Sequence, residues 1–564
     1  MMKKSMLLLV SALLVSYSAR ADVVTVSQAE RTARQFVNKN ASRLNAAAGG
    51  DLKLAHQAIS KGGTPDYYVF NRGDQGGFVV VSGDDRLQPV CGYCDHGTFD
   101  LEKLPSNVKW WFGEYQRQVQ YLRDHPQVKV RKKVTLSSSV GPLLTTKWDQ
   151  RKPFNDMCPV SPNEDDTYWI YGNRACAGCV AISLSQIMNF YQWPEQGIGS
   201  KTYTFDLDGE VSTTLSADFS QSFYQWNLMK DEYLYMDKNN YGYFDDNMHV
   251  YIKVIDENGD TITDPNGIHS NAVAKLISDV GIACEMGYGS AGSGAYTYYA
   301  YYALWDYFKY FVVYANRDNY QGEWDEDLRE ELDMNRPMYY AGQASGGHAF
   351  VIDGYDNQGL FHVNWGWGGW YDGYYESLAL NPGGEDGYNS NQEVMVFYPY
   401  HPLTSSPASG ESIDFGRTTI GNAVTRTVTV TGLYIDENQD IQVSIIGDDA
   451  AQFRTVNTLS SASANQDGGV TFEVYYEPST GGQHSAQLVI EAGNDYAGNK
   501  IEPIIIYLNG NTGIYFDAND DGVIDVDDVT RAISACLNGE VLNYLGRIPD
   551  VSDVSELIAR VIGD

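Results

Sequence analysis

Basic residues are scarce in this chain. Its 564 residues include 39 Lys and Arg against 73 Asp and Glu, which gives a formal net charge of −34. A field of this sign repels phosphate, so broad binding to nucleic acid or to anionic lipid is not expected. An acidic surface is instead typical of a soluble extracellular protein.

Long apolar runs are also lacking. A membrane-spanning helix needs about 20 apolar residues, and the N-terminal run at 6–15 is shorter, as is every later one. This run follows Lys3 and Lys4 and precedes Ala19-Arg20-Ala21, the small-x-small pattern that signal peptidase recognises. We therefore predict a signal peptide over residues 1–21, no membrane span, and a secreted or periplasmic protein.

Charged residues make up only 20% of the chain, too few for a disordered protein, whereas hydrophobic residues reach 43%. At about 100 to 200 residues per domain, the length predicts several domains. The 55 Gly and 42 Tyr favour many turns and half-buried strands, so we expect an α+β fold class with all-β accessories. The chain has seven cysteines, and an odd number leaves at least one thiol unpaired.

Residues 22–135 are predicted to form a small α+β domain that ends in a linker. Ser27-x-x-Glu30 is typical of a helix start, and the spacing of apolar residues over 108–122 predicts a second helix, with strands between the two. The polar, basic stretch at 127–139 is either a cleavable linker or an ordinary surface loop.

Residues 136–400 form the largest predicted domain, and the reactive motifs all fall in it. Apolar spacing predicts helices near 179–191 and 271–280. Strands are predicted near 348–355, 360–364 and 394–398.

After a linker at 401–411, the pattern changes to period two. Val424, Arg426, Val428 and Val430 alternate with threonines, which predicts an Ig-like β-sandwich over 412–510. This region has no reactive cluster, so a binding or spacer role is expected.

The last segment, residues 511–564, contains an acidic loop with the ligand spacing of a calcium site. Positions 1, 3, 5, 7, 9 and 12 are Asp517, Asn519, Asp521, Val523, Asp525 and Asp528. Asp at the last position, instead of the Glu of an EF-hand, resembles dockerin modules, as does the partial repetition of the stretch 525–533 at 550–558. The second loop has Leu542 and Tyr544 at ligand positions, so we predict one Ca²⁺. The alternative is a solvated acidic turn. The resemblance implies a cohesin-like or cell-surface partner.

Cys179 is a candidate nucleophile. Apolar residues recur at helical spacing from Val180 to Tyr191, so Cys179 is predicted at or just inside a helix N-terminus. Backbone N–H groups there, with a neighbouring imidazolium, would stabilise a thiolate and lower the pKa of the thiol. By itself, a Cys in an apolar run is more often a buried, inert thiol.

His348 is the candidate partner of this thiol, because the two glycines before it leave room for a substrate backbone. Asn364 follows farther along the chain, at the end of a strand that could lie beside that of His348. Its amide oxygen would then accept a hydrogen bond from one ring nitrogen, and Trp365 would shield that bond from water. A lone His, however, is usually structural.

The motifs together resemble the streptopain family, secreted bacterial cysteine peptidases with a papain-like fold. They are Gly178-Cys179-Val180-Ala181, Gly346-Gly347-His348-Ala349-Phe350-Val351-Ile352-Asp353-Gly354 and His362-Val363-Asn364-Trp365-Gly366-Trp367-Gly368-Gly369. Residues 77–84 are similar to that family's propeptide, and Trp148-Asp149-Gln150 to the start of its mature enzyme. The likeness covers about 22–400.

This resemblance implies a cysteine endopeptidase made as a zymogen, which cleaves proteins or peptides and is inhibited by its own propeptide at 22–135. It implies Cys179 as the nucleophile, His348 as the general base and acid, and Asn364 with Trp365 as the orienting pair. No cofactor is expected for catalysis.

Two further residues follow from the same resemblance. Papain-like enzymes carry a Gln six residues before the nucleophile as an oxyanion donor, and this chain has Asn173, whose side chain is one methylene shorter. Papain relatives also bridge a Cys three residues before the nucleophile, which implies that Cys176 pairs with Cys158 or Cys284.

Three alternatives stay open. An inert peptidase fold would make the chain an adhesin or a scaffold-bound module, and acyl transfer to amines would use the same Cys and His. Cys91-x-x-Cys94 with Cys176-x-x-Cys179 could suggest a zinc site, but the two pairs lie much farther apart than the ~15 to 20 residues of a zinc ribbon.

Overall fold

The computed structural model describes residues 23–41, 44, 50–60, 62–125, 136–160, 174–236, 251–255, 261–264, 267–342, 348–377, 392–466, 468–495, 500–512, 515–519, 523–542, 544–545 and 547–563. The predicted signal peptide and most of the basic linker lie outside these residues. The chain divides into two compact units, 1–399 and 400–564. In the described part of the chain, no helix combines the length and the hydropathy that a membrane span requires.

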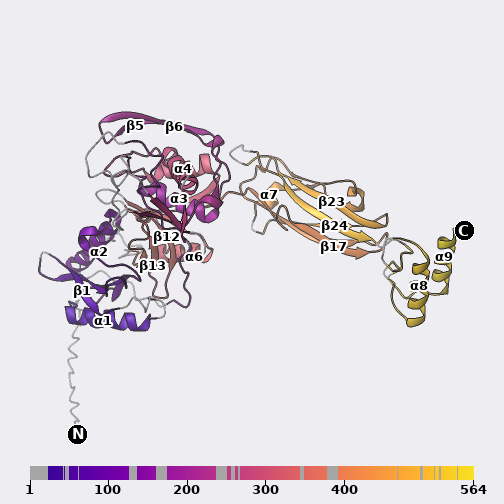
Figure 1. Ribbon diagram of the computed structural model, residues 1–564, viewed down its shortest axis with the longest axis horizontal. Coiled ribbons are helices and arrows are strands. Elements are labelled where there is room, and N and C mark those ends of the chain that lie inside the picture. The colour runs from indigo at the N-terminus through magenta and orange to yellow at the C-terminus, as the bar shows by residue number, and fades with distance from the viewer. Residues whose placement is uncertain are drawn as a thin grey trace, which may run out of the picture. The chain divides into compact units, whose positions relative to one another are not determined.

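The first unit begins with a small α+β domain, residues 23–125, which we call the N-terminal domain (Figure 1). Its elements are α1 (Val26–Lys39), β1 (Leu52–Ile59), β2 (Pro65–Arg72), β3 (Phe78–Ser82), β4 (Val90–Cys94) and α2 (Ser106–Asp124). The predicted α+β character is confirmed. The first helix starts earlier than Ser27, because Thr25 and Gln28 form the capping box.

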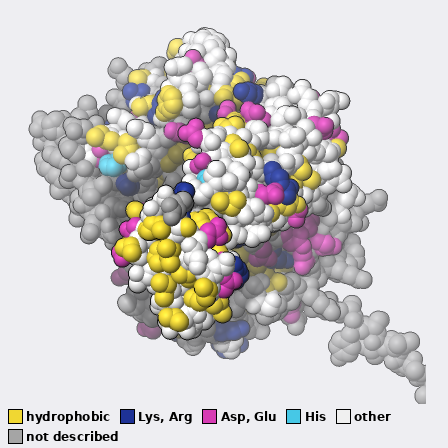
Figure 2. All heavy atoms as spheres, turned by 90° about the vertical axis from the view of Figure 1, so that its right-hand side faces the viewer, with side chains coloured by type: hydrophobic (Ala, Val, Ile, Leu, Met, Phe, Trp, Pro, Cys, Tyr) yellow, Lys and Arg dark blue, Asp and Glu magenta, His cyan; other side chains and the backbone are white. Residues whose placement is uncertain are grey.

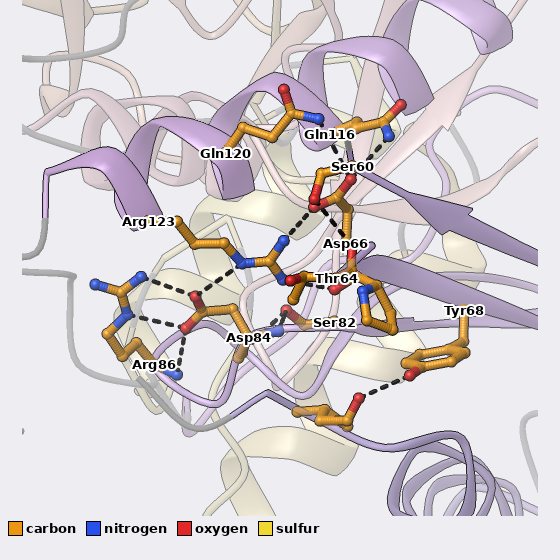
Figure 3. A network of polar contacts seen from close by, with 12 residues as sticks. Ser60, Thr64, Asp66, Tyr68, Ser82, Asp84, Arg86, Gln116, Gln120 and Arg123 are labelled. Atoms are coloured by element: carbon orange, nitrogen blue, oxygen red, sulfur yellow. Dashed lines mark hydrogen bonds and ion pairs between the residues drawn. The ribbon is translucent and has the colours of Figure 1, made fainter. Parts of the chain in front are cut away.

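A polar network fastens the end of α2 to the sheet of the N-terminal domain (Figure 3). The buried carboxylate of Asp66, at the start of β2, pairs with Arg123 and accepts a hydrogen bond of 2.8 Å from Gln116. Arg123 also lies 3.9 Å from Asp84, which pairs with Arg86 at 2.8 Å. Because buried carboxylates need charged partners, this network fixes where α2 lies on the sheet.

The rest of the first unit, residues 136–399, is called the central domain here. Its helices are α3 (Cys179–Tyr191), α4 (Ile268–Ala283), α5 (Thr297–Phe308) and α6 (Trp324–Asp333). Its strands are β5 (Ser200–Leu207), β6 (Val211–Asp218), β7 (Glu232–Met236), β8 (Tyr251–Ile255), β9 (Thr261–Thr263), β10 (Tyr310–Asn316), β11 (Met338–Gly342), β12 (His348–Tyr355), β13 (Phe361–Asn364), β14 (Gly373–Tyr375) and β15 (Gln392–Pro399).

One sheet runs through both domains of this unit. Its strand order is β1-β2-β3-β4-β14-β13-β12-β11-β15-β10, with β4 antiparallel to β14 at the boundary. Tyr93 stacks on Tyr374, with ring centroids 5.1 Å apart, and the Glu376 N–H donates to the Cys91 carbonyl at 3.0 Å. The N-terminal domain therefore joins the central domain by backbone pairing as well as by side-chain contacts.

Helix α3 lies in the core of the central domain. Its residues from Cys179 to Met188 are all buried, and it packs against α4, β11 and β12. A helix that is apolar on all sides is typical of a buried central position. This packing brings the start of α3 to the start of β12.

The second unit contains a β-sandwich. Its sheets have the orders β16-β18-β22-β20 and β17-β24-β23-β19-β21 and share one core. The elements are β16 (Leu403–Ser406), β17 (Ser412–Thr418), β18 (Val424–Gly432), β19 (Ile441–Ile446), β20 (Phe453–Arg454), β21 (Thr458–Leu459), α7 (Ser461–Ala464), β22 (Val470–Tyr476), β23 (Gly482–Glu491) and β24 (Ile504–Thr512). The range predicted as a linker, 401–411, contains β16, which pairs with β18 and so belongs to the sandwich.

A two-helix module ends the chain. Helix α8 (Val526–Asn538) and helix α9 (Val551–Ile562) start with capping boxes, at Asp525 and Asp550 respectively. Ala532, Ala535, Leu542, Tyr544 and Leu557 are part of its small core. Leu542 and Tyr544, which occupy ligand positions of the repeated loop, are thus core residues.

The β4–β14 contact predicts a selective effect of substitution at Gly92. A Cβ atom there would lie 2.8 Å from the Tyr375 ring, so Gly92→Val overpacks the boundary, at a cost of about 1–3 kcal/mol. We expect faster amide hydrogen exchange at 373–376, by about one to two orders of magnitude. Gly113→Ala is the control, since nothing lies within 4 Å of a Cβ at that position. Equal exchange in both variants would contradict the prediction.

Candidate active site

Cys179 is the first residue of α3, as the sequence predicts. Gly178 caps the helix with φ of 90°, and a Cβ at this position would lie 2.9 Å from the Met286 sulfur. Only glycine combines that backbone conformation with that close approach. The turn places the Cys179 sulfur at the N-terminal end of the helix.

A cleft of about 780 Å³ opens over this sulfur. His348, the first residue of β12, lines the same cleft, and the N–H of Ala349 donates to Cys179 Sγ at 3.4 Å. The fold thus brings together two residues that are 169 positions apart in the sequence (348 − 179). The two predicted catalytic residues thus line one cleft.

Asn364 does not make the hydrogen bond that the sequence suggests. Strands β12 and β13 are neighbours, but their register pairs Asn364 with Val351, three residues beyond His348. The Asn364 amide donates to the Thr146 carbonyl at 2.8 Å, and its oxygen accepts from Gln186 at 3.1 Å. The predicted bond to the His348 ring is not among the described contacts. The amide instead ties β13 to helix α3 through Gln186.

Trp365 is fully buried and packs against Phe350, with ring centroids 4.8 Å apart. Its indole N–H donates to the Tyr371 carbonyl at 3.1 Å. It therefore belongs to the core beneath β12, whereas Trp367, two residues later, lines the cleft. That Trp365 shields a His–Asn bond stays a prediction, since the contacts of the described residues show Trp365 packed on Phe350 and bonded to Tyr371.

Comparisons with known proteins agree with this geometry. Residues 148–375 match the family model described as Peptidase C10 family, and residues 21–119 match that of Spi protease inhibitor. The streptopain of Streptococcus pyogenes is 30% identical over 393 residues, which cover 65% of this chain and 90% of that protein. The chain belongs to the peptidase C10 family.

A further relative is also named as a thiol protease. The thiol protease/hemagglutinin PrtT of Porphyromonas gingivalis is 30% identical over 553 residues, which cover 92% of this chain but only 56% of that protein. A structure of a Prevotella intermedia prointerpain A fragment is 31% identical, covers 61% of this chain and 98% of that one, and has a TM-score of 0.47. The chain is accordingly a cysteine peptidase with an inhibitor-like N-terminal domain.

Asn173, the predicted oxyanion donor of the peptidase, lies outside the described residues. Gln150 lines the cleft, is almost fully buried, and its carbonyl accepts from the N–H of Ala177, two residues before the nucleophile. Gln150 and Cys179 therefore line the same cleft. Sequence spacing could not identify Gln150, because this residue and the nucleophile are distant along the chain, but the Trp148-Asp149-Gln150 motif was a usable signal.

The N-terminal domain borders the cleft of the peptidase. Ser106 and Asn107, at the start of α2, line it, and the Asn107 amide donates to the Trp365 carbonyl at 2.7 Å. The ring of Trp110 lies against Gly342, so closely that a Cβ there would overlap it. This part of α2 thus occupies one wall of the cleft.

Burial shifts the pKa of both Cys179 and His348 in the direction that favours the neutral form. Burial raises the pKa of the Cys179 thiol, and the backbone N–H groups of Ala349 and Val180 only partly offset it. Burial also lowers the pKa of the His348 ring. The predicted lowering of the thiol pKa by the helix terminus is therefore wrong here, because desolvation outweighs it.

The predicted disulfide at Cys176 is also wrong. All seven cysteines are thiols in this structure, and the Cys176 thiol donates to the Ser290 carbonyl at 3.7 Å. Cys158 and Cys284 are buried in the same core as Cys179. Cys91 and Cys94 of the N-terminal domain belong to a different core cluster, and Cys94 donates to the Asp372 carbonyl at 3.0 Å.

The raised thiol pKa predicts slow alkylation of the unprocessed chain. A thiol with a raised pKa contains less thiolate at neutral pH, so iodoacetamide is expected to modify Cys179 slowly at that pH. The rate of modification is expected to increase as the pH rises into the alkaline range. Mass spectrometry of the Cys179 peptide gives the rate, with the partly exposed Cys536 as internal reference. Fast alkylation of Cys179 already at acidic pH would contradict this assignment.

Proposed function

We propose that the chain is a secreted cysteine endopeptidase made as a zymogen. The observation that carries this proposal is the cleft in which Cys179, at a helix N-terminus, and His348 lie together, with the Ala349 N–H directed at the sulfur. The predicted signal peptide supports export, and the match of residues 21–119 to an inhibitor family supports a propeptide role for the N-terminal domain.

In this mechanism the Cys179 thiol gives its proton to His348 and the sulfur attacks the carbonyl carbon of a peptide bond. The imidazolium then protonates the leaving amine as the carbon–nitrogen bond breaks, which leaves an acyl-enzyme thioester. His348 next takes a proton from water, the hydroxide displaces the sulfur, and the carboxylic acid product leaves. The cycle returns the Cys179 thiol and the neutral His348 ring, and it needs no metal or cofactor.

The oxyanion of each tetrahedral intermediate needs donors near the sulfur. The Cys179 backbone N–H at the helix start is one, and we assign the second to the Gln150 side chain, which lines the cleft. Asn173 stays a second candidate, from the family resemblance alone. Trp367 contributes to the cleft wall, and Asn364 holds the loop that carries it through its bond to Gln186.

The N-terminal domain would keep this site inactive in two ways. Asn107 and Ser106 line a wall of the cleft through which substrate would pass, and burial raises the pKa of the Cys179 thiol. Cleavage at or near the predicted basic linker, 127–139, would release the domain. Loss of that cover exposes the sulfur and the ring to water, so the charged forms of both become less costly.

Substitutions test this assignment. Cys179→Ala is expected to stop both self-maturation and casein hydrolysis, with a loss of at least about a thousandfold. Gln150→Ala removes one oxyanion donor and is expected to lower kcat by about a hundredfold to a thousandfold. The control is Cys536→Ala in the C-terminal module, which should mature and hydrolyse casein normally.

The same assay separates the rival functions. Equal processing of the Cys179→Ala and unmodified chains would refute self-activation. An unmodified, processed chain that neither hydrolyses casein nor reacts with an epoxysuccinyl inhibitor would indicate an adhesin. Incorporation of an amine without hydrolysis would indicate acyl transfer.

For the C-terminal module we propose one Ca²⁺, held by Asp517, Asn519, Asp521, Val523, Asp525 and Asp528. Buried carboxylates support this proposal, since Asp517 and Asp528 are 3% and 0% exposed. Asp528 Oδ1 accepts from the N–H groups of Ala518 and Asn519, whereas Oδ2 accepts, among the described residues, from Asp525 alone and keeps a lone pair for a metal. Within the same residues, no Lys or Arg pairs with Asp528. Asp521 lies outside the described residues.

The second half of the module supports the same proposal by contrast. Asp553 is the counterpart of Asp528 in the repeated stretch. Arg547 binds it with two hydrogen bonds, of 2.7 and 2.6 Å. A guanidinium therefore supplies there the positive charge that the first loop would take from Ca²⁺.

We further propose that this module docks to a partner protein of the cohesin-like or cell-surface kind. Figure 2 shows hydrophobic side chains gathered on the face of the module turned toward the viewer. Val526 and Leu537 on α8 are 64% and 80% exposed, and their counterparts on α9, Val551 and Ile562, are 76% and 68% exposed. Large exposed apolar side chains in such number are typical of interaction surfaces.

Calcium titration tests the module. We expect one Ca²⁺ per chain by calorimetry and slower hydrogen exchange over 515–542 when Ca²⁺ is added, because the ion closes the loop. Asp517→Ala is expected to abolish both effects and to release the docked partner, as chelation would. Arg547→Ala is the matched control: it should speed exchange over 547–563 equally with and without Ca²⁺. An Asp517→Ala chain that still responds to Ca²⁺ would refute the site.

A further inference from the structure

A row of tyrosines leads out of the cleft along helix α5. Tyr296, just before the helix, lines the cleft and is 73% exposed. The ring centroids of Tyr296 and Tyr299 lie 6.2 Å apart, and those of Tyr299 and Tyr298 lie 5.6 Å apart. Tyr298 in turn contacts Tyr302 at 4.8 Å. These four residues, which we call the tyrosine track, form a continuous aromatic surface that starts in the cleft wall.

The core does not require the tyrosine track. Helix α5 is anchored by its other side, where Ala300, Ala303, Leu304 and Phe308 are buried. On the outer side, Tyr298 and Tyr302 are 65% and 44% exposed, one helical turn apart. Aromatic rings held at the surface by a fixed helix offer large contact area at little entropic cost, which is why Tyr is enriched at binding surfaces.

The occupant that fits this surface is a polypeptide. The track is continuous with the cleft in which a peptide bond is placed for cleavage, so a bound chain that leaves the cleft on this side meets it. Its phenol rings present mainly apolar aromatic faces, so they suit apolar or aromatic segments of a polypeptide.

The length of the track sets how much substrate is needed to reach it. From Tyr296 to Tyr302 the helix rises about 9 Å, at ~1.5 Å per residue. An extended chain covers this distance in about three residues, at ~3.3 Å each. A peptide that fills only the cleft therefore does not touch Tyr302, whereas one extended by several residues does.

We propose that the tyrosine track is an exosite that binds apolar or aromatic segments of the substrate polypeptide outside the cleft. This inference rests on the proposed peptidase function of Cys179. It assigns preference for long, apolar-flanked substrates to α5 rather than to the residues around the scissile bond.

Two substrates of different length test the exosite on enzyme matured from the full chain. One is a short peptide taken from a casein site that the unmodified enzyme cleaves, and the other is the same peptide with six residues added at each end, including Phe and Leu. Tyr298→Ser with Tyr302→Ser is expected to lower kcat/KM for the long peptide about tenfold, mainly through KM, and to leave the short peptide unchanged. The control is Phe223→Ser, since Phe223 is 61% exposed but does not line the cleft.

The outcomes separate the possibilities. An equal loss on both peptides, or no loss on the long one, overturns the exosite. Loss of polysaccharide binding with unchanged cleavage of both peptides also overturns it, in favour of a glycan surface. Failure of the unmodified enzyme to cleave the short peptide would instead refute the proposed function. Peptides extended at one end only then show which end of the substrate lies on α5.

Discussion

The packing of helix α3 against strand β12 is the contact on which the rest of the first unit depends. It places the helix start, with Cys179, against the strand start, with His348, so that the Ala349 N–H reaches the sulfur. Gln186, farther along α3, bonds to the Asn364 amide and so fixes β13 beside β12. One buried helix thus positions the nucleophile, the imidazole strand and the loop of the cleft wall together.

The two elements that make this contact, α3 and β12, could be predicted from the sequence. The extents predicted for α3 and β12 agree with the structure, because both elements are apolar over most of their length and are bounded by glycine-rich turns. Helix α5 was not predicted. Its Thr297, Tyr298, Tyr299, Tyr301 and Tyr302 favour strands by propensity, and only the burial of Ala303 and Leu304 in the tertiary fold makes the segment helical.

The errors at the site have a different origin. The bond expected between Asn364 and His348 depends on the register of β12 and β13. A shift of the register by a few residues changes which side chains lie opposite each other, and no local sequence pattern determines this register. The pKa of Cys179 depends on how deeply the thiol is buried, and burial is a property of the tertiary structure. Gln150 belongs to the Trp148-Asp149-Gln150 motif, but only the tertiary fold places it in the cleft that Cys179 also lines.

The shared sheet would gain a new edge if the proposed cleavage removed the N-terminal domain. Removal of β4 leaves β14 with unpaired backbone groups, and such exposed edges invite pairing between molecules. Strand β14, however, spans only Gly373–Tyr375, and Gly373 adds no side chain to it. So short an edge offers few hydrogen bonds to a neighbouring chain, which limits edge-to-edge pairing at this strand.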